Sequence, residues 1–186
     1  PGGGAGVEAN RPAGIDPEAE LLAFLNRHLF DKQLELTFVT AFLAIYDPAG
    51  KSLRYSNAGH NPPLVRRANG VMEELTEGGL LVGMLPEQPY KQQETILEPG
   101  DVAVLYTDGI TEAMGPDAEG RVPAEDDEDA PDHMFDEAAL QEVVAQNAHR
   151  SAAGLKEAIL AAVARHTAGV PQSDDITLVV IKRTRG

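Results

Sequence analysis

Cysteine is absent from the 186-residue chain. The chain can therefore form no disulfide, has no thiolate nucleophile and cannot hold zinc through cysteine, and the absence is typical of proteins in a reducing cytoplasm. Long apolar runs are also missing, because no stretch approaches the roughly 20 residues that a membrane-spanning helix needs. These two absences predict a cytoplasmic protein whose folded part makes no membrane contact.

Basic residues are scarce, since 15 Lys and Arg face 30 Asp and Glu and the net charge is −15. A nucleic-acid binder needs a basic face that neutralises phosphates, and a polybasic membrane contact needs the same excess of Lys and Arg. We therefore expect no nucleic-acid partner. An acidic chain can still handle phosphate groups if its carboxylates hold cations, because a bound ion reverses the local charge.

The chain begins with PGGGAGVEANRPAG, which has neither an initiating Met nor the charged-then-apolar pattern of a signal peptide. Its glycine-rich composition predicts a flexible linker or loop over residues 1–15, followed by one folded domain over residues 16–184. Inside that domain, residues 115–133 are too acidic to bury a core and are predicted to form a surface loop.

Helical patterns occupy three stretches. Asp16 is a good capping residue in front of a helix over 17–30, because Pro17 suits the first helical position. The leucines of that helix recur at helical spacing and are expected to face the core. They are Leu21, Leu22, Leu25 and Leu29. Asp136 is predicted to cap a later helix, a further helix is predicted to follow Ser151, and Gly169 suits the C-terminal cap of that last helix.

The middle and the end of the chain have strand patterns. Residues 38–46 are β-rich and apolar on both faces, which predicts a central strand, and residues 52–58 return as its hairpin partner. Asn69-Gly70 favours the turn of a second hairpin. Residues 102–107 predict a buried strand that ends at Asp108, and Asp174-Asp175 open the last strand. The sequence therefore predicts an α+β fold with a mostly antiparallel sheet.

Three acids stand where two of these strands end and begin. If the strands are antiparallel neighbours, Asp108 meets Asp174 and Asp175 at one end of the sheet. Converging carboxylates repel one another unless a cation lies between them, and their hard oxygen ligands suit Mg²⁺ or Mn²⁺. The alternative is ordinary turn chemistry, because Asp-Gly is common in turns and Ser-Asp-Asp is a polar strand start. Spacing alone leaves both interpretations open.

Three segments carry a resemblance to a known family. They are FVTAFLAIYDPAGKSLRYSNAGHNPPLV, LEPGDVAVLYTDGITEA and SDDITLVVI. In this order they resemble the SpoIIE-type branch of the PPM (protein phosphatase 2C-like) serine/threonine phosphatases, from about Pro17 to Lys182. The resemblance implies an antiparallel β-sandwich flanked by helices. It also implies hydrolysis of phosphoserine or phosphothreonine on a regulatory protein of the anti-sigma-factor antagonist type in bacterial signalling.

The resemblance also implies roles for single residues. Asp108 and Asp174 match family metal ligands, Asp175 and Gly109 take supporting positions, and two Mn²⁺ or Mg²⁺ ions would activate a water in place of a protein nucleophile. Three further residues belong to the motif without an assigned role. They are Thr107, Thr111 and Glu112. His60 could be a general acid or a metal ligand, but we favour a turn, because its neighbours are mostly Gly, Asn and Pro.

The sequence also departs from the family. The family begins with a Gly-Asp-x-x-Asp strand and a Gly-Asp-x-x-Gly-x-Gly segment, and neither occurs before Pro17. We therefore expect residues 16–184 to represent the C-terminal two-thirds of the phosphatase domain. Two rival hypotheses remain, a non-catalytic interaction module on the same scaffold and an all-β ligand-binding domain with coincidental Asp motifs.

Overall fold

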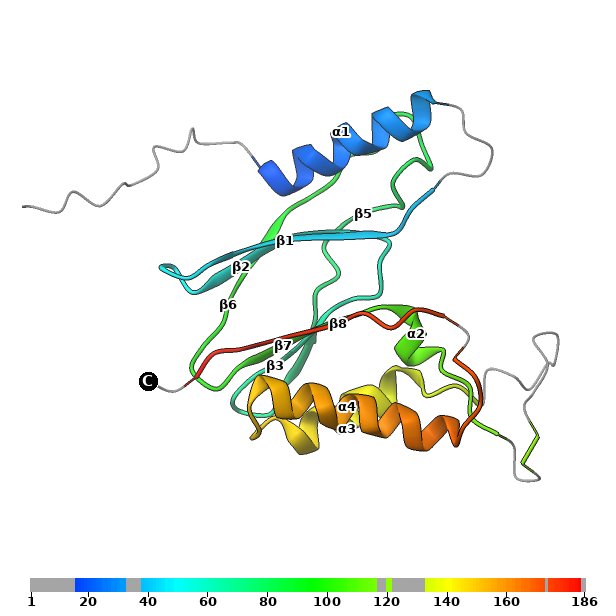
Figure 1. Cartoon of the computed structure of the whole chain (residues 1–186). Coiled ribbons are helices and arrows are strands. Elements are labelled where there is room, and N and C mark those ends of the chain that lie inside the picture. Colours follow the sequence, from blue (N-terminus) through cyan, green and yellow to red (C-terminus); the bar gives the residue numbers. More distant parts are fainter. Residues whose placement is uncertain (1–15, 33–37, 117–119, 122–132, 173, 185–186) are drawn as a thin grey trace, which may run out of the picture.

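The structure is a computed structural model, and it describes residues 16–32, 38–116, 120–121, 133–172 and 174–184. The predicted linker over 1–15 and most of the predicted acidic loop over 115–133 lie outside these residues. The described part forms four layers, with one helix, two β-sheets and a pair of helices stacked in that order (Figure 1). The predicted α+β fold with two facing sheets is confirmed.

The helices are α1 (Pro17–Asp31), α2 (Asp108–Thr111), α3 (Asp136–Asn147) and α4 (Ala152–Thr167). The strands are β1 (Ala41–Asp47), β2 (Ser52–Ala58), β3 (Leu64–Arg66), β4 (Met72–Glu74), β5 (Gly78–Gly79), β6 (Gln93–Ile96), β7 (Val102–Tyr106) and β8 (Leu178–Lys182). The short α2 and β5 were not predicted. Among the described residues, no helix has the length and apolar character to cross a membrane.

The first sheet is built around β2. This strand pairs antiparallel with β1 and β6, and parallel with β5. The prediction that residues 38–46 form a central strand is wrong for the described part of the chain, where β1 pairs only with β2. Ile45 and Tyr46 on β1 are therefore 44% and 38% exposed, because no described strand lies on the other side.

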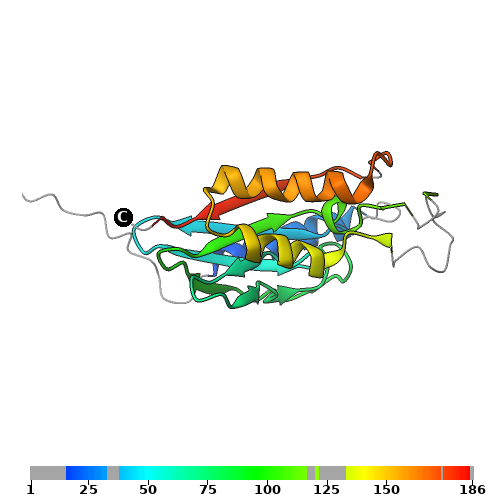
Figure 2. The same cartoon turned by 90° about the horizontal axis from the view of Figure 1, so that it is seen from below.

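The second sheet has the order β4-β3-β7-β8 and is antiparallel throughout. Alternate residues of β7 face opposite ways, as strand geometry dictates. Val102, Val104 and Tyr106 pack in the core beneath α3 and α4, whereas Ala103 packs in the core between the two sheets. Figure 2 shows α3 and α4 side by side across this sheet. A rigid buried strand thus leads directly to Asp108.

The apolar stripe predicted on α1 is only partly buried. Leu22 is 1% exposed, but Leu21 and Leu25 are 45% and 39% exposed. The face that packs on the first sheet instead carries Glu18, Leu22 and Asn26, which are four residues apart and therefore lie on one side of the helix.

Asn26 is buried because its side chain binds the backbone of a distant loop. Its amide donates to the Leu85 carbonyl at 2.8 Å, and its oxygen accepts from the Gly83 N–H at 2.8 Å. A buried polar group is tolerated when its hydrogen bonds are satisfied in this way. Periodicity alone could not reveal this contact, which joins residues far apart in the sequence.

The predicted helix caps have mixed outcomes. Asp136 is the first residue of α3, and its Oδ1 accepts from the Ala139 N–H at 2.8 Å, which agrees with a capping role at this helix start. The last helix follows Ser151 as predicted, and the Ser151 side chain accepts from the Gly154 N–H at 3.1 Å, a cap that was not predicted. Asp16 does occupy the N-cap position of α1, but its side chain makes no capping hydrogen bond.

Candidate functional site

The acids singled out from the sequence lie at one end of the second sheet. β7 and β8 are antiparallel neighbours, and Tyr106 at the end of β7 stands opposite Leu178 at the start of β8. Asp108 follows β7 closely, and the segment holding Asp174 and Asp175 leads into β8. Their predicted meeting at one end of the sheet is confirmed. None of these three acids lies within a strand, however, because Asp108 is the first residue of α2 and β8 begins only at Leu178.

Thr107 ties the two segments together. Its hydroxyl donates to the Asp175 carbonyl at 3.0 Å and accepts from the Thr177 N–H at 2.9 Å. Its own N–H donates to the Thr177 carbonyl at 3.1 Å. No role was predicted for Thr107. The signal that could have found it is a hydroxyl residue between a buried strand and an Asp-Gly turn, where side-chain to backbone bonds are common.

Gly109 allows the two segments to approach closely. A Cβ atom at this position would lie 2.6 Å from the Asp175 carbonyl oxygen and 3.2 Å from the Asp174 carbonyl oxygen. Real Cβ atoms essentially never come within 3.0 Å of another heavy atom. Glycine is therefore needed for the close approach of two backbone segments, and this agrees with the supporting role expected for Gly109.

Each of two carboxylates is oriented by a local backbone donor. Asp108 Oδ1 accepts from the Gly109 N–H at 3.0 Å, and Asp174 Oδ1 accepts from the Asp175 N–H at 2.7 Å. Within the described part of the chain, neither Oδ2 takes part in a hydrogen bond. Each acid thus keeps one oxygen available to a cation, the kind of ligand that Mg²⁺ and Mn²⁺ prefer.

These two carboxylates alone do not make a metal site. The described residues contain no group of three or more His, Cys, Asp or Glu side chains that could hold a metal ion together. Asp108 and Asp174 have the right chemistry and lie on adjoining segments. A complete coordination shell would need further oxygen ligands, and waters, substrate oxygens and protein groups are all of that kind.

The segment NAGHNPP forms a turn beside α2. Asn57 holds it, since its oxygen accepts from the His60 N–H at 2.8 Å and its amide donates to the His60 carbonyl at 2.9 Å. Asn61 then reaches α2, because its amide donates to the Thr111 hydroxyl at 3.4 Å. The turn interpretation of this segment is therefore supported. Asn61 is a contact to the site that the sequence reasoning missed.

Tyr106 at the end of β7 and a cavity beside Gly109 complete this end of the sheet. Burial, assisted by the charges of Glu137 and Glu74, raises the pKa of Tyr106 to about 12, so its hydroxyl stays protonated and cannot act as a base near neutral pH. A cavity of about 240 Å³ adjoins Gly109. It is lined mainly by apolar groups of α4 and of the segment before β8, including Leu160, Val163 and Ile176.

Comparison with known proteins agrees with this architecture. The family model described as Stage II sporulation protein E (SpoIIE) matches residues 7–184. Phosphoserine phosphatase RsbU of Bacillus subtilis is 34% identical over 100 residues, which cover 53% of this chain and 30% of RsbU.

Two solved structures share the fold. The SiaA-PP2C domain of Pseudomonas aeruginosa matches with a TM-score of 0.69 at 22% identity, and the matched region covers 88% of this chain and 60% of the SiaA-PP2C chain. The manganese-presoaked phosphatase domain of SpoIIE from Bacillus subtilis matches with a TM-score of 0.61 at 19% identity, and the matched region covers 94% of this chain and 68% of the SpoIIE chain. The chain thus spans less than a third of RsbU and under two-thirds of the SiaA domain. By the family model and the shared fold, the chain belongs to the SpoIIE family of PP2C-type phosphatases.

Proposed function

We propose that this chain contributes to a metal-dependent protein phosphatase that hydrolyses phosphoserine or phosphothreonine, with Asp108 and Asp174 as metal ligands. The observation that carries the proposal is the close packing of Gly109 on the Asp175 carbonyl, because it brings the two acid-bearing segments together. Manganese is a reasonable ion, since a relative of the same fold was presoaked with it. When bound, such ions lower the pKa of a water and orient it toward phosphorus.

The chain's own residues supply position and charge. Asp108 is held by the Gly109 N–H at the start of α2, and Thr107 fixes α2 to the segment before β8. Asp175 contributes through its backbone, since its carbonyl accepts the Thr107 hydroxyl and its N–H orients the Asp174 carboxylate. We therefore assign Asp175 and Gly109 to support rather than to coordination.

We propose a phosphoserine on a regulatory protein of the anti-sigma-factor antagonist type as the substrate. The support is the similarity to RsbU, which is named a phosphoserine phosphatase. A folded regulatory protein would present its phosphorylated residue to the exposed end of the second sheet. The proposal places the action of the protein in the cytoplasm.

The test measures Mn²⁺ binding and hydrolysis of para-nitrophenyl phosphate by this chain, with a chelator as control. Wild-type chain should bind Mn²⁺ and turn over the ester only without chelator. Asp108→Asn and Asp174→Asn should each lower turnover by at least a hundredfold and weaken Mn²⁺ binding, because each removes a charged ligand. Asp31→Asn is the matched control, since Asp31 is exposed at the end of α1 and distant in the fold from this site.

The competing hypothesis is a non-catalytic interaction module on the same scaffold. It is favoured by the lack of a three-ligand group within the described residues. Under this hypothesis the chain neither binds Mn²⁺ nor turns over the ester. Both Asp variants should then keep the wild-type fold. Wild-type turnover that persists in Asp108→Asn and Asp174→Asn would contradict the metal-ligand assignment.

A further inference from the structure

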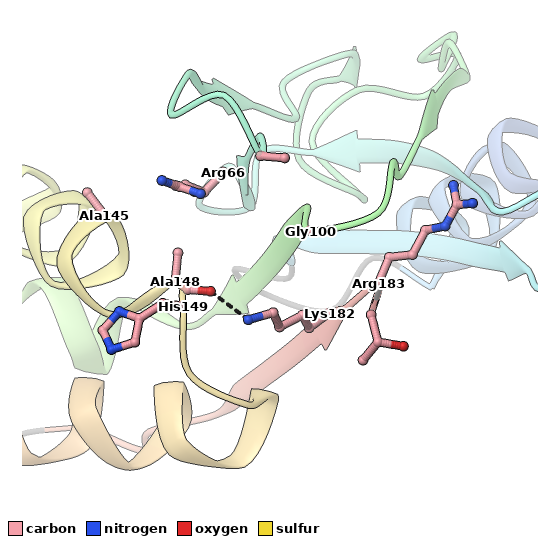
Figure 3. Close-up of a pocket in the computed structure, with 9 residues that line it drawn as sticks. Arg66, Gly100, Ala145, Ala148, His149, Lys182 and Arg183 are labelled. Atoms are coloured by element: carbon pink, nitrogen blue, oxygen red, sulfur yellow. Dashed lines mark hydrogen bonds between the residues drawn. The ribbon is translucent and has the colours of Figure 1, made fainter. Parts of the chain in front are cut away.

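Basic side chains gather around a second cavity, far from the acids. This cavity has a volume of about 530 Å³ and lies between α3 and the second sheet (Figure 3). Arg66 at the end of β3, His149 after α3 and Lys182 at the end of β8 line it. Small residues leave the space open. They are Ala68, Gly100, Ala145 and Ala148. A cluster of this kind is notable in a chain with twice as many acidic as basic residues.

Arg66 has an unmet hydrogen-bonding need. Its Nε is buried, and within the described part of the chain it has no hydrogen-bond partner. The next residue is very different, since Arg67 bonds Asp101 at 2.9 Å and also pairs with Glu73. A buried donor left without an acceptor destabilises the folded state. Because Arg66 also lines the cavity, an anion there would give its guanidinium an acceptor.

Lys182 is held in place at the cavity wall. Its Nζ donates to the Ala148 carbonyl at 2.6 Å and to the Arg150 carbonyl, which leaves one of its three N–H groups for a ligand. Arg183 does not add to the cluster, because its guanidinium bonds the Leu97 carbonyl and points away from Lys182 in Figure 3. The cationic groups available to a ligand are therefore Arg66, Lys182 and, when protonated, His149.

We propose that this cavity binds a small phosphorylated molecule. Phosphate oxygens are strong acceptors for guanidinium and ammonium donors, and the volume falls within the range of small-molecule sites. The acidic charge of the whole chain disfavours a nucleic acid. The cavity adjoins Gly100, before β7, whereas Asp108 follows β7. The five residues of that strand span roughly 17 Å, so the two sites are separate and this inference does not depend on the proposed catalytic function.

Calorimetric titration with pyrophosphate tests the proposal. The buffer contains a chelator and no divalent cation, so that a metal at Asp108 and Asp174 cannot recruit the probe. Wild-type chain should bind pyrophosphate, and Arg66→Gln should weaken binding at least tenfold. Lys156→Gln is the matched control, because it removes the same charge from an exposed position on α4 and should change binding less than twofold.

Thermal unfolding without ligand shows whether Arg66→Gln is still folded. Arg66→Gln should unfold at the wild-type temperature or slightly higher, since it removes an unpartnered buried donor. Equal pyrophosphate binding by wild type, Arg66→Gln and Lys156→Gln would overturn the site. Absence of wild-type binding at millimolar pyrophosphate would also overturn it. Binding of a phosphoserine peptide, but not of pyrophosphate, in an Arg66-dependent way would replace the small molecule by a protein ligand.

Discussion

Gly109→Ala is the sharpest perturbation of the acid end, because it adds one methyl group where two backbone segments touch. The new Cβ would meet the Asp175 carbonyl oxygen at 2.6 Å, and this oxygen belongs to the backbone and cannot rotate away. Restoring a contact of 3.4 Å, at which ordinary van der Waals distances begin, requires the segments to separate by about 0.8 Å.

That displacement sets the expected magnitudes. Overpacking of a tight contact costs about 1–3 kcal/mol, and replacing glycine by alanine returns about 0.4–1 kcal/mol by restricting the unfolded chain. We expect a net loss of about 1–2 kcal/mol, which corresponds to a melting temperature about 2–8 °C lower for a chain of this size. Functional groups must be held within about 0.5 Å, so a 0.8 Å displacement of Asp108 from Asp174 should weaken Mn²⁺ binding at least tenfold.

The assay combines thermal unfolding with Mn²⁺ titration followed by electron paramagnetic resonance of the free ion. Gly154→Ala is the control, because a Cβ there would approach only side-chain atoms of Ser151 and Arg150, the nearest at 3.3 Å. Gly154 lies in the first turn of α4, where alanine is favoured by up to about 1 kcal/mol. The control should therefore keep wild-type Mn²⁺ affinity and equal or higher stability.

Either of two results would refute this reasoning. If Gly109→Ala unfolds at the same temperature as the wild-type protein and binds Mn²⁺ equally well, the contact between α2 and the Asp175 carbonyl does not position the acids. If its stability falls while its Mn²⁺ affinity is unchanged, the contact is structural only, and Asp108 and Asp174 do not share an ion.

Two further predictions concern hydrogen bonds. Thr107→Val should lower the free energy of unfolding by about 1–2 kcal/mol, whereas Thr107→Ser should stay near wild type, because only valine loses both bonds to residues 175–177. Burial raises the pKa of Asp101, but hydrogen bonds from the Glu98 N–H and from Arg67 outweigh it, so the pKa lies below 3.8. Asp101→Asn should therefore cost about 2–4 kcal/mol at pH 7, and urea denaturation should show this difference shrinking as the pH falls below 3.8 through the lower folded pKa.

Local patterns predicted much of this fold because the physics that they encode is local. Asn69-Gly70 sits in the turn between β3 and β4, where Gly70 has φ +98°, a conformation that glycine adopts readily. The buried strand β7 and the hydrogen bond of Asp136 at the start of α3 likewise agree with patterns that span only a few residues. Such signals survive because no distant contact opposes them.

The errors fall where distant contacts decide. On α1, the leucine pattern favoured Leu21 and Leu25 as core residues, but the helix turns Glu18 and Asn26 inward instead. Asn26 gains hydrogen bonds from a loop nearly 60 residues away. For Glu18 the compensation is weaker, since its fully buried carboxylate has Arg54 at 3.6 Å and no hydrogen bond within the described residues. Hydrophobic periodicity contains no information about such partners.

The two ends of the second sheet explain why one site was predicted and the other was not. The acid end needs only two segments, and the single assumption that β7 and β8 are antiparallel brings Asp108 to Asp174. The cationic cavity needs three segments, each of which contributes one common basic residue with no motif around it. Its only sequence signal is statistical. In a chain with 15 basic and 30 acidic residues, basic side chains that gather without acidic partners indicate an anion site. Such a cluster can be recognised only after the fold shows which acidic groups each basic side chain contacts.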